Sequence, residues 1–187
     1  MTKLALITGS PDHVGSLRDA FRANGVDTLT LAELRPGTAP VDYYVQLGHN
    51  VPARGETVVR RVHAFLNDGL LERFLAAERV VPLLAATATV VLVAGNLPAE
   101  VAAPDDRAAR LAMLRVLAHA MRADLAPAQV RIRVVSGGHS DAEIVGYALS
   151  GGKDPLAESE PPDERGVTGR TYEDWRIAVL GMAQIET

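Results

Sequence analysis

Three histidines stand where an α/β sheet would place catalytic side chains. His13, His49 and His139 close the stretches SPDH, QLGH and SGGH, each of which follows an apolar run typical of a parallel strand. The carboxyl ends of such strands line the ligand crevice, and a histidine titrating near neutral pH can move a proton to or from a substrate. The alternative is three unrelated, solvated loop residues. No two histidines have His-x-x-His or i, i+4 spacing, so we expect no metal site.

The stretch LITGSPDHVGSLRDAF, residues 6–21, has the order of strand, glycine turn and helix that holds dinucleotide phosphates. His13 adds bulk where the backbone would approach the pyrophosphate, and Asp12 adds negative charge. Both oppose a phosphate, so the sequence predicts no firm cofactor and leaves NAD(P) as an open alternative at a vestigial or weak site. The residues of that site would be Thr8, Gly9, Ser10, Gly15, Gly48 and Gly95.

The residue that follows the second strand of such a fold selects between NAD and NADP. An acid there holds a ribose hydroxyl of NAD, whereas a basic residue accommodates the extra phosphate of NADP. Glu33 and Arg35 both follow the second predicted strand. The sequence therefore indicates no preference between the two cofactors.

Continuous apolar runs alternate with amphipathic stretches along the chain, which predicts a parallel sheet covered on both faces. We expect one Rossmann-like, doubly wound α/β domain over residues 1–187, with a mostly parallel sheet of about six strands. The expected strands are 3–8, 26–31, 41–48, 89–95, 130–138 and 175–182, the last being a helix in an alternative interpretation. The expected helices begin near Gly15, Glu56 and Asp105.

The segment at 150–166 differs from the rest of the chain. It reads SGGKDPLAESEPPDERG, with glycine, proline and acids and almost no apolar residues. Such a composition cannot bury enough apolar surface to order itself. We interpret it as a mobile acidic loop or lid.

Composition narrows the partners and the location of this 187-residue chain. The net charge of −4 and the lack of a basic tract argue against nucleic acid. The chain has no cysteine, so disulfides and thiol chemistry are excluded. We see no signal peptide at the start, and the longest apolar run is too short to span a membrane. We expect a cytoplasmic protein with no membrane and no nucleic-acid partner.

The order of these stretches resembles the short-chain dehydrogenase/reductase (SDR) family. TGSPDHVG (8–15) is similar to the family's TGxxxGxG loop, and VDYYVQLGHN (41–50) to the strand ending in NNAG. RAARLAMLRVLAHAMRADLAPAQVRIRVVSGG (107–138) resembles the stretch after the catalytic lysine, and GVTGRTY (166–172) the entrance of the closing strand. The likeness implies a nucleotide-binding sheet, shortened here by one strand–helix unit after the second strand.

The resemblance also implies catalytic residues, and this chain departs from them. The family's Tyr-x-x-x-Lys motif falls on Ala103 and Arg107, and the segment after the fourth strand, AGNLP (94–98), has no hydroxyl for the family serine. The family asparagine would fall near Gly69, with Asn67 out of register. A carbonyl reductase needs a phenol of lowered pKa beside a cation, and neither is provided at these positions.

We therefore interpret the chain as a degenerate SDR-like protein, a pseudoenzyme that binds a small molecule or a partner as an accessory protein. Two alternatives remain. One is a divergent NAD(P)(H)-dependent oxidoreductase. The other is a non-redox enzyme that uses His13, His49 or His139 as acid or base.

The long helices also predict a homodimer. Proteins of the family that the chain resembles pair the corresponding helices across a two-fold axis. In this chain the two helices are 56–79 and 105–124. The apolar residues of RAARLAMLRVLAHAM, in the second helix, lie around more of its circumference than packing against the sheet alone would need, so a second apolar face is left for a partner. The alternative is that a neighbouring helix of the same chain covers the second apolar face.

Overall fold

The computed structural model describes residues 2–38, 40–48, 56–57, 59–60, 63, 65–95 and 104–150. All of them belong to one compact unit, Met1–Gly151. The predicted sixth strand at 175–182 lies outside the described residues, and so does the predicted loop at 150–166 apart from its first residue. A single domain over 1–187 therefore stays a prediction.

Five parallel strands form one sheet in the described part of the chain. They are β1 (Leu4–Thr8), β2 (Asp27–Thr30), β3 (Val41–Gln46), β4 (Leu84–Val93) and β5 (Arg131–Val135). Their spatial order is β2-β1-β3-β4-β5, and each neighbouring pair runs parallel. This confirms the predicted Rossmann-like, parallel α/β fold and supplies five of the expected strands.

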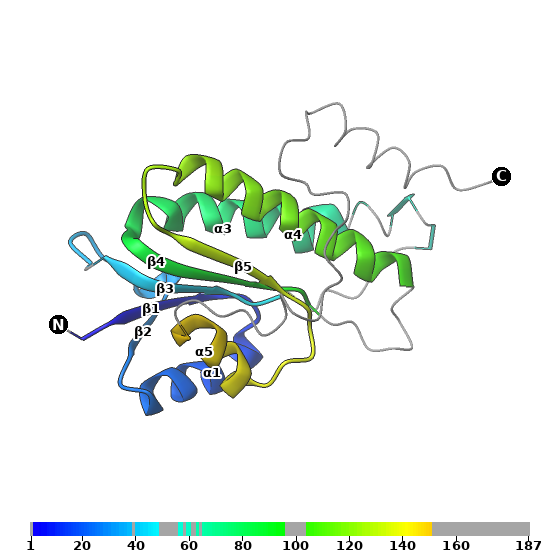
Figure 1. The fold of residues 1–187 in the computed structure, drawn as a ribbon. Helices are drawn as coiled ribbons and strands as arrows, with labels where there is room; N and C mark the ends of the chain where they lie inside the picture. The colour runs from blue at the N-terminus through cyan, green and yellow to red at the C-terminus, as the bar shows by residue number, and fades with distance from the viewer. Residues whose placement is uncertain are drawn as a thin grey trace. The chain divides into compact units, whose positions relative to one another are not determined.

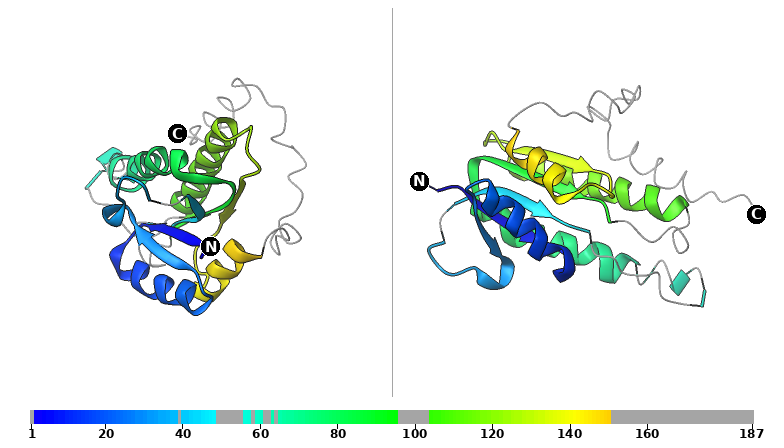
Figure 2. Two further views of the ribbon diagram at one scale, coloured as in Figure 1. Left: turned by 90° about the vertical axis from the view of Figure 1, so that its left-hand side faces the viewer. Right: turned by 90° about the horizontal axis from the view of Figure 1, so that it is seen from below.

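Helices cover both faces of the sheet, as Figures 1 and 2 show. On one face lie α1 (Pro11–Ala23) and α5 (Asp141–Leu149), and on the other lie α3 (Glu72–Val80) and α4 (Pro104–Asp124). A π-helix, η2 (Phe65–Leu71), runs directly into α3, and two short 3-10 helices are η1 (Leu31–Glu33) and η3 (Val81–Leu83). This alternation gives the doubly wound arrangement.

The core lies on both sides of the central strands because β1, β3 and β4 are apolar on both of their faces. On the α3–α4 side, helix residues pack on the strands in one cluster. On the other side, buried residues of α1 and α5 face the sheet. Members of the first set are Leu6, Tyr44, Ala77, Val80, Val90, Leu92, Leu114, Leu117, Ala118 and Met121, and the second includes Leu17, Phe21, Ile144 and Val145.

Two boundaries and one additional helix differ from the sequence predictions. Helix α1 begins at Pro11, four residues before the predicted start, because proline at the first helical position has its φ already set for a helix. Strand β4 begins at Leu84 rather than residue 89, and its first residues are only partly buried, which hides them from an apolar pattern. Helix α5 was not expected at all.

Candidate functional site

The carboxyl ends of the parallel strands form the edge at which a ligand would bind. Strand β1 has β2 on one side and β3 on the other, so the chain changes direction between β1 and β3, and the crevice of such sheets lies at that reversal. The loops there are joined directly, since Leu47 N–H donates to the Thr8 carbonyl over 2.7 Å. We call residues Thr8–Ser10 and Leu47–Gly48 the switch-point site.

Close backbone packing explains three of the predicted site glycines. Gly9 has φ +132°, and a Cβ there would lie 2.5 Å from Leu47 Cβ. A Cβ on Gly48 would lie 2.5 Å from the Gly95 nitrogen, so the ends of β3 and β4 touch through their glycines. Gly9 and Gly48 are therefore required by the chain itself, whether or not a cofactor is bound, and Gly95 is their close backbone neighbour at the end of β4.

Helix α1 begins almost directly after β1, so no open phosphate-binding loop separates the two elements. Only Gly9 and Ser10 separate β1 from α1, and Pro11 at the first helical position has no N–H to donate. His13 N–H already donates to the Ser10 carbonyl over 3.1 Å. Gly15 lies within α1, and a Cβ there would meet no atom within 4 Å. The helix start therefore offers few donors to a phosphate.

Thr8 faces a buried polar network instead of the crevice. Its hydroxyl lies 3.1 Å from Tyr44 Oη, to which Gln46 Nε2 donates over 2.9 Å. Arg73 of α3, only 5% exposed, donates from Nε to Gln46 Oε1 over 2.8 Å and from Nη2 to the carbonyls of Gln46 (3.2 Å) and Val93 (2.8 Å). Burial raises the pKa of Tyr44, which stays neutral. The arginine thus fixes the ends of β3 and β4 together.

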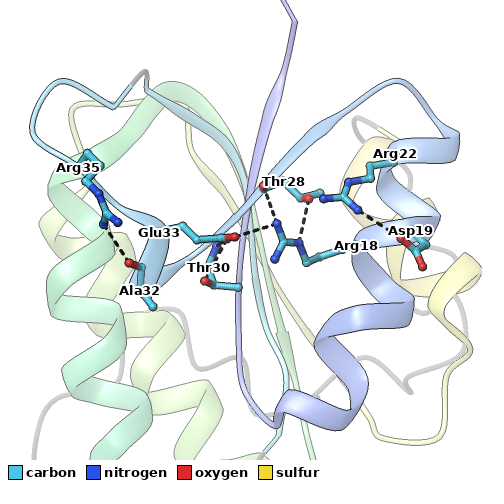
Figure 3. A network of polar contacts seen from close by, with 8 residues as sticks. All are labelled: Arg18, Asp19, Arg22, Thr28, Thr30, Ala32, Glu33 and Arg35. Atoms are coloured by element: carbon cyan, nitrogen blue, oxygen red, sulfur yellow. Dashed lines mark hydrogen bonds and ion pairs between the residues drawn. The ribbon is translucent and has the colours of Figure 1, made fainter.

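The two predicted cofactor selectors after β2 serve local structure, as Figure 3 shows. Glu33 Oε2 accepts from the Thr30 backbone (2.7 Å) and hydroxyl (3.1 Å), and Oε1 accepts from Arg18 Nη2 (3.1 Å). The Thr30 backbone hydrogen bond, joined by the hydroxyl and Arg18, lowers the pKa of Glu33. Arg35 Nη1 donates to the Ala32 carbonyl over 3.0 Å. The carboxylate therefore caps η1.

His139, after β5, lies in a small polar cluster. Its Nε2 is 3.3 Å from Ser136 Oγ, and its Nδ1 is 3.9 Å from Glu143 Oε2. The Tyr147 ring meets the imidazole edge-on, with centroids 5.2 Å apart. The side chain is 16% exposed. A histidine so placed has one ring nitrogen toward a hydroxyl and the other toward a carboxylate.

The strand order keeps the described histidines apart. His13 follows β1 and His139 follows β5, and two strands lie between them. With neighbouring strands about 4.8 Å apart, this separates the two strand ends by about 14 Å. No hydrogen bond or ion pair joins the two side chains in the described structure. His49, and also Asn50 and Asn96, lie outside the described residues, so their place at this edge stays a prediction.

The similarity of this chain to known proteins supports its fold and no more than its fold. No family model matches the sequence, and no curated protein matches it. Among solved structures, the chain is similar to the crystal structure of a predicted short-chain dehydrogenase/reductase from Corynebacterium glutamicum. The TM-score is 0.52 at 20% identity, over 81% of this chain and 94% of that one. The fold is SDR-like.

The described residues contain neither a cluster of metal ligands nor a membrane-spanning helix. Among them, no three His, Cys, Asp or Glu side chains gather as metal ligands would. No described helix has both the length and the apolar character to cross a membrane. The cytoplasmic location and the lack of a nucleic-acid partner stay predictions.

Sequence reasoning overlooked four residues of these networks. Neither Arg73 nor Tyr44 is among the candidate site residues that the sequence singles out. Ser136 and Glu143 were not considered as partners of His139, although SxxHxxxE (136–143) spaces the three residues so that one turn and one helix start could bring them together. The motif SDAE (140–143) has the capping-box pattern that indicates the start of a helix.

Proposed function

We propose that this SDR-like protein binds a small molecule or a partner as an accessory protein and does not carry out the family's hydride transfer. The ligand would lie at the switch-point site, extended by Ala94–Gly95 and by the loop after β5.

The junction of β1 and α1 is the observation that carries this proposal. A dinucleotide needs several backbone N–H groups aimed at its pyrophosphate. Here Pro11 provides none, and His13 N–H already donates to the Ser10 carbonyl. The sequence places an acid, Asp12, between these two residues. The Glu33 carboxylate, which would hold the ribose of NAD, caps η1.

The sequence supports the same proposal at the reacting centre. The family's tyrosine and lysine positions fall on Ala103 and Arg107, and AGNLP (94–98) offers no serine. An alanine cannot donate a proton to a carbonyl. Tyr44 is buried in β3, where its hydroxyl contacts Thr8 and Gln46, and it is not available as a substitute donor.

A non-redox enzyme is the second candidate, and one observation favours it. His139 lies between a hydroxyl and a carboxylate at the carboxyl edge, the setting in which a histidine acts as acid or base. His13 is exposed on α1 without such partners among the described residues.

Thermal unfolding with NADH, NADPH and AMP at millimolar concentration tests the proposal. We expect no rise in melting temperature with either dinucleotide and no NADPH oxidation with a panel of carbonyl compounds. Gly15→Ala is the matched variant, because its Cβ meets no protein atom yet would crowd a dinucleotide in a TGxxxGxG-type loop. A rise with NADPH that is absent with AMP and reduced in Gly15→Ala would contradict the proposal.

A further inference from the structure

We propose that Ser136, His139 and Glu143 form a nucleophile, base and acid that cleave small carboxylic esters through an acyl-serine intermediate. This site lies in the loop after β5, which also borders the ligand site proposed above, but the inference does not depend on that proposed binding function. It assigns the loop between β5 and α5 a chemistry of its own.

The hydroxyl, imidazole and carboxylate are arranged in the order found in serine hydrolases. Ser136 Oγ lies 3.3 Å from His139 Nε2, and the other ring nitrogen, Nδ1, faces Glu143 Oε2 at 3.9 Å. Nδ1 is the ring nitrogen nearer to the carboxylate, although no hydrogen bond joins them at this distance. With the imidazole proton on Nδ1, Nε2 is the nitrogen that accepts a proton from the hydroxyl. Ser136 is exposed, so a substrate carbonyl can reach its oxygen.

The carboxylate is fixed in place and ionised. Glu143 Oε2 accepts from the Ser140 backbone N–H and from its hydroxyl, both over 2.8 Å. The backbone hydrogen bond, followed by that of the hydroxyl, lowers the pKa of Glu143. The same oxygen faces His139, so the capping box of α5 also positions the negative charge that an imidazolium needs.

Backbone donors follow the nucleophile directly. Gly137 and Gly138 come next in the chain, and Gly138 has φ +92°, a conformation that turns successive amides toward one side. Neither amide hydrogen-bonds to another described residue. They are thus candidates for the donors that stabilise the oxyanion of a tetrahedral intermediate.

The reaction balances with an ester and water alone. Ser136 Oγ forms a bond to the carbonyl carbon while its proton passes to His139 Nε2. The imidazolium returns that proton to the leaving alkoxide as the ester C–O bond breaks, which leaves the acyl group on Ser136. Water, deprotonated by the same nitrogen, then attacks the acyl carbon. The imidazolium passes that proton to Ser136 Oγ as the bond between Oγ and the acyl carbon breaks, which releases the carboxylic acid and restores the serine hydroxyl.

A purely structural role is the competing interpretation, in which His139 and Glu143 only frame the start of α5. Labelling with an ethyl fluorophosphonate separates the two, since it adds phosphorus to an activated serine and releases fluoride. We expect one adduct, located on Ser136 by peptide mass spectrometry, and steady-state hydrolysis of p-nitrophenyl acetate. Histidine alone can cleave that ester, so the covalent adduct is the deciding readout.

Four variants sharpen the test. Ser136→Ala should abolish the adduct, and His139→Gln should slow labelling by about a hundredfold or more. Glu143→Gln can still cap α5, so it should retain the melting temperature and KM while lowering kcat about tenfold. Ser16→Ala, an exposed serine on α1, should label as the wild type does. No adduct in the folded wild type, or an equal adduct in Ser136→Ala, would overturn the proposal whatever the dinucleotide experiment gives.

Discussion

At the residue scale, the acid after β2 shows how one side chain invites two interpretations. From its position in the sequence Glu33 is a cofactor selector. In the structure it closes the Thr30–Glu33 capping box and binds Arg18 (Figure 3). The arrangement holds α1, β2 and η1 together, so the carboxylate contributes to stability.

Replacing this carboxylate should cost stability in a pH-dependent way. Glu33→Ala loses the cap and the ion pair, and we expect about 1 kcal/mol less free energy of unfolding at pH 7. Because the folded state lowers the Glu33 pKa below 4.5, this contribution is full above pH 4.5 and disappears as the pH falls through the folded-state pKa. Urea unfolding in steps from pH 7 to about pH 3 measures the difference between the two proteins.

The exposed pair Arg22–Asp19 offers the control. Asp19 is 79% exposed and 3.4 Å from its partner, so Asp19→Asn should change stability by only a few tenths of a kcal/mol. An equal loss in the two variants would show that Glu33 is an ordinary surface charge.

The sequence anticipates which residue types end each strand but not their partners. Thr8 ends β1, Gly48 lies just after β3, and His139 lies in the loop after β5. The partners of His139 come from α5 and its capping box, which an apolar pattern does not reveal in a helix of nine residues. The hydrogen bonds of Arg73 depend on how α3 lies across β3 and β4, a tertiary arrangement without local signal.

At the element scale, the strands were predictable because burial on both faces produces continuous apolar runs. The residues at which the helices start were harder to predict. The proline that opens α1 and the serine that caps α5 are signals of start positions, yet the family-like spacing of TGSPDHVG favoured an open loop over a helix at Pro11. The sequence therefore contained a local signal for the start of α1, the proline at residue 11, but the family resemblance led to a later predicted start.

Two glycines of the predicted cofactor site should respond to alanine with opposite signs. Gly48→Ala places a Cβ against the Gly95 backbone, which cannot move without separating β3 from β4, and we expect a loss of about 1–3 kcal/mol. Gly15→Ala meets no atom within 4 Å in the interior of α1 and should gain about 0.5–1 kcal/mol. Chemical denaturation of both variants measures the two effects, and a destabilised Gly15→Ala would contradict the placement of α1.

At the scale of the whole molecule, one helix pair has an apolar surface beyond the core. Leu71 is 52% exposed and Leu75 is 44% exposed, and residues four apart share one face of a helix. On α4 the core face is made by Leu114, Leu117, Ala118 and Met121. The residues beside that face, which include Ala112 and Val116, are only partly buried. The described helices of this chain therefore leave apolar area on the two segments that the sequence assigns to a homodimer.

A charge on this surface should separate the predicted dimer. Burying a leucine side chain contributes about 1.5–3 kcal/mol, and a two-fold interface counts each substitution twice, so Leu75→Glu should convert a dimer at tens of micromolar into a monomer. Light scattering measures the mass, and circular dichroism confirms that the variant is folded. Arg22→Glu, an exposed change on α1 at the opposite face of the sheet, should leave the mass unchanged. If the wild-type protein has the mass of a monomer at that concentration, the predicted homodimer is wrong.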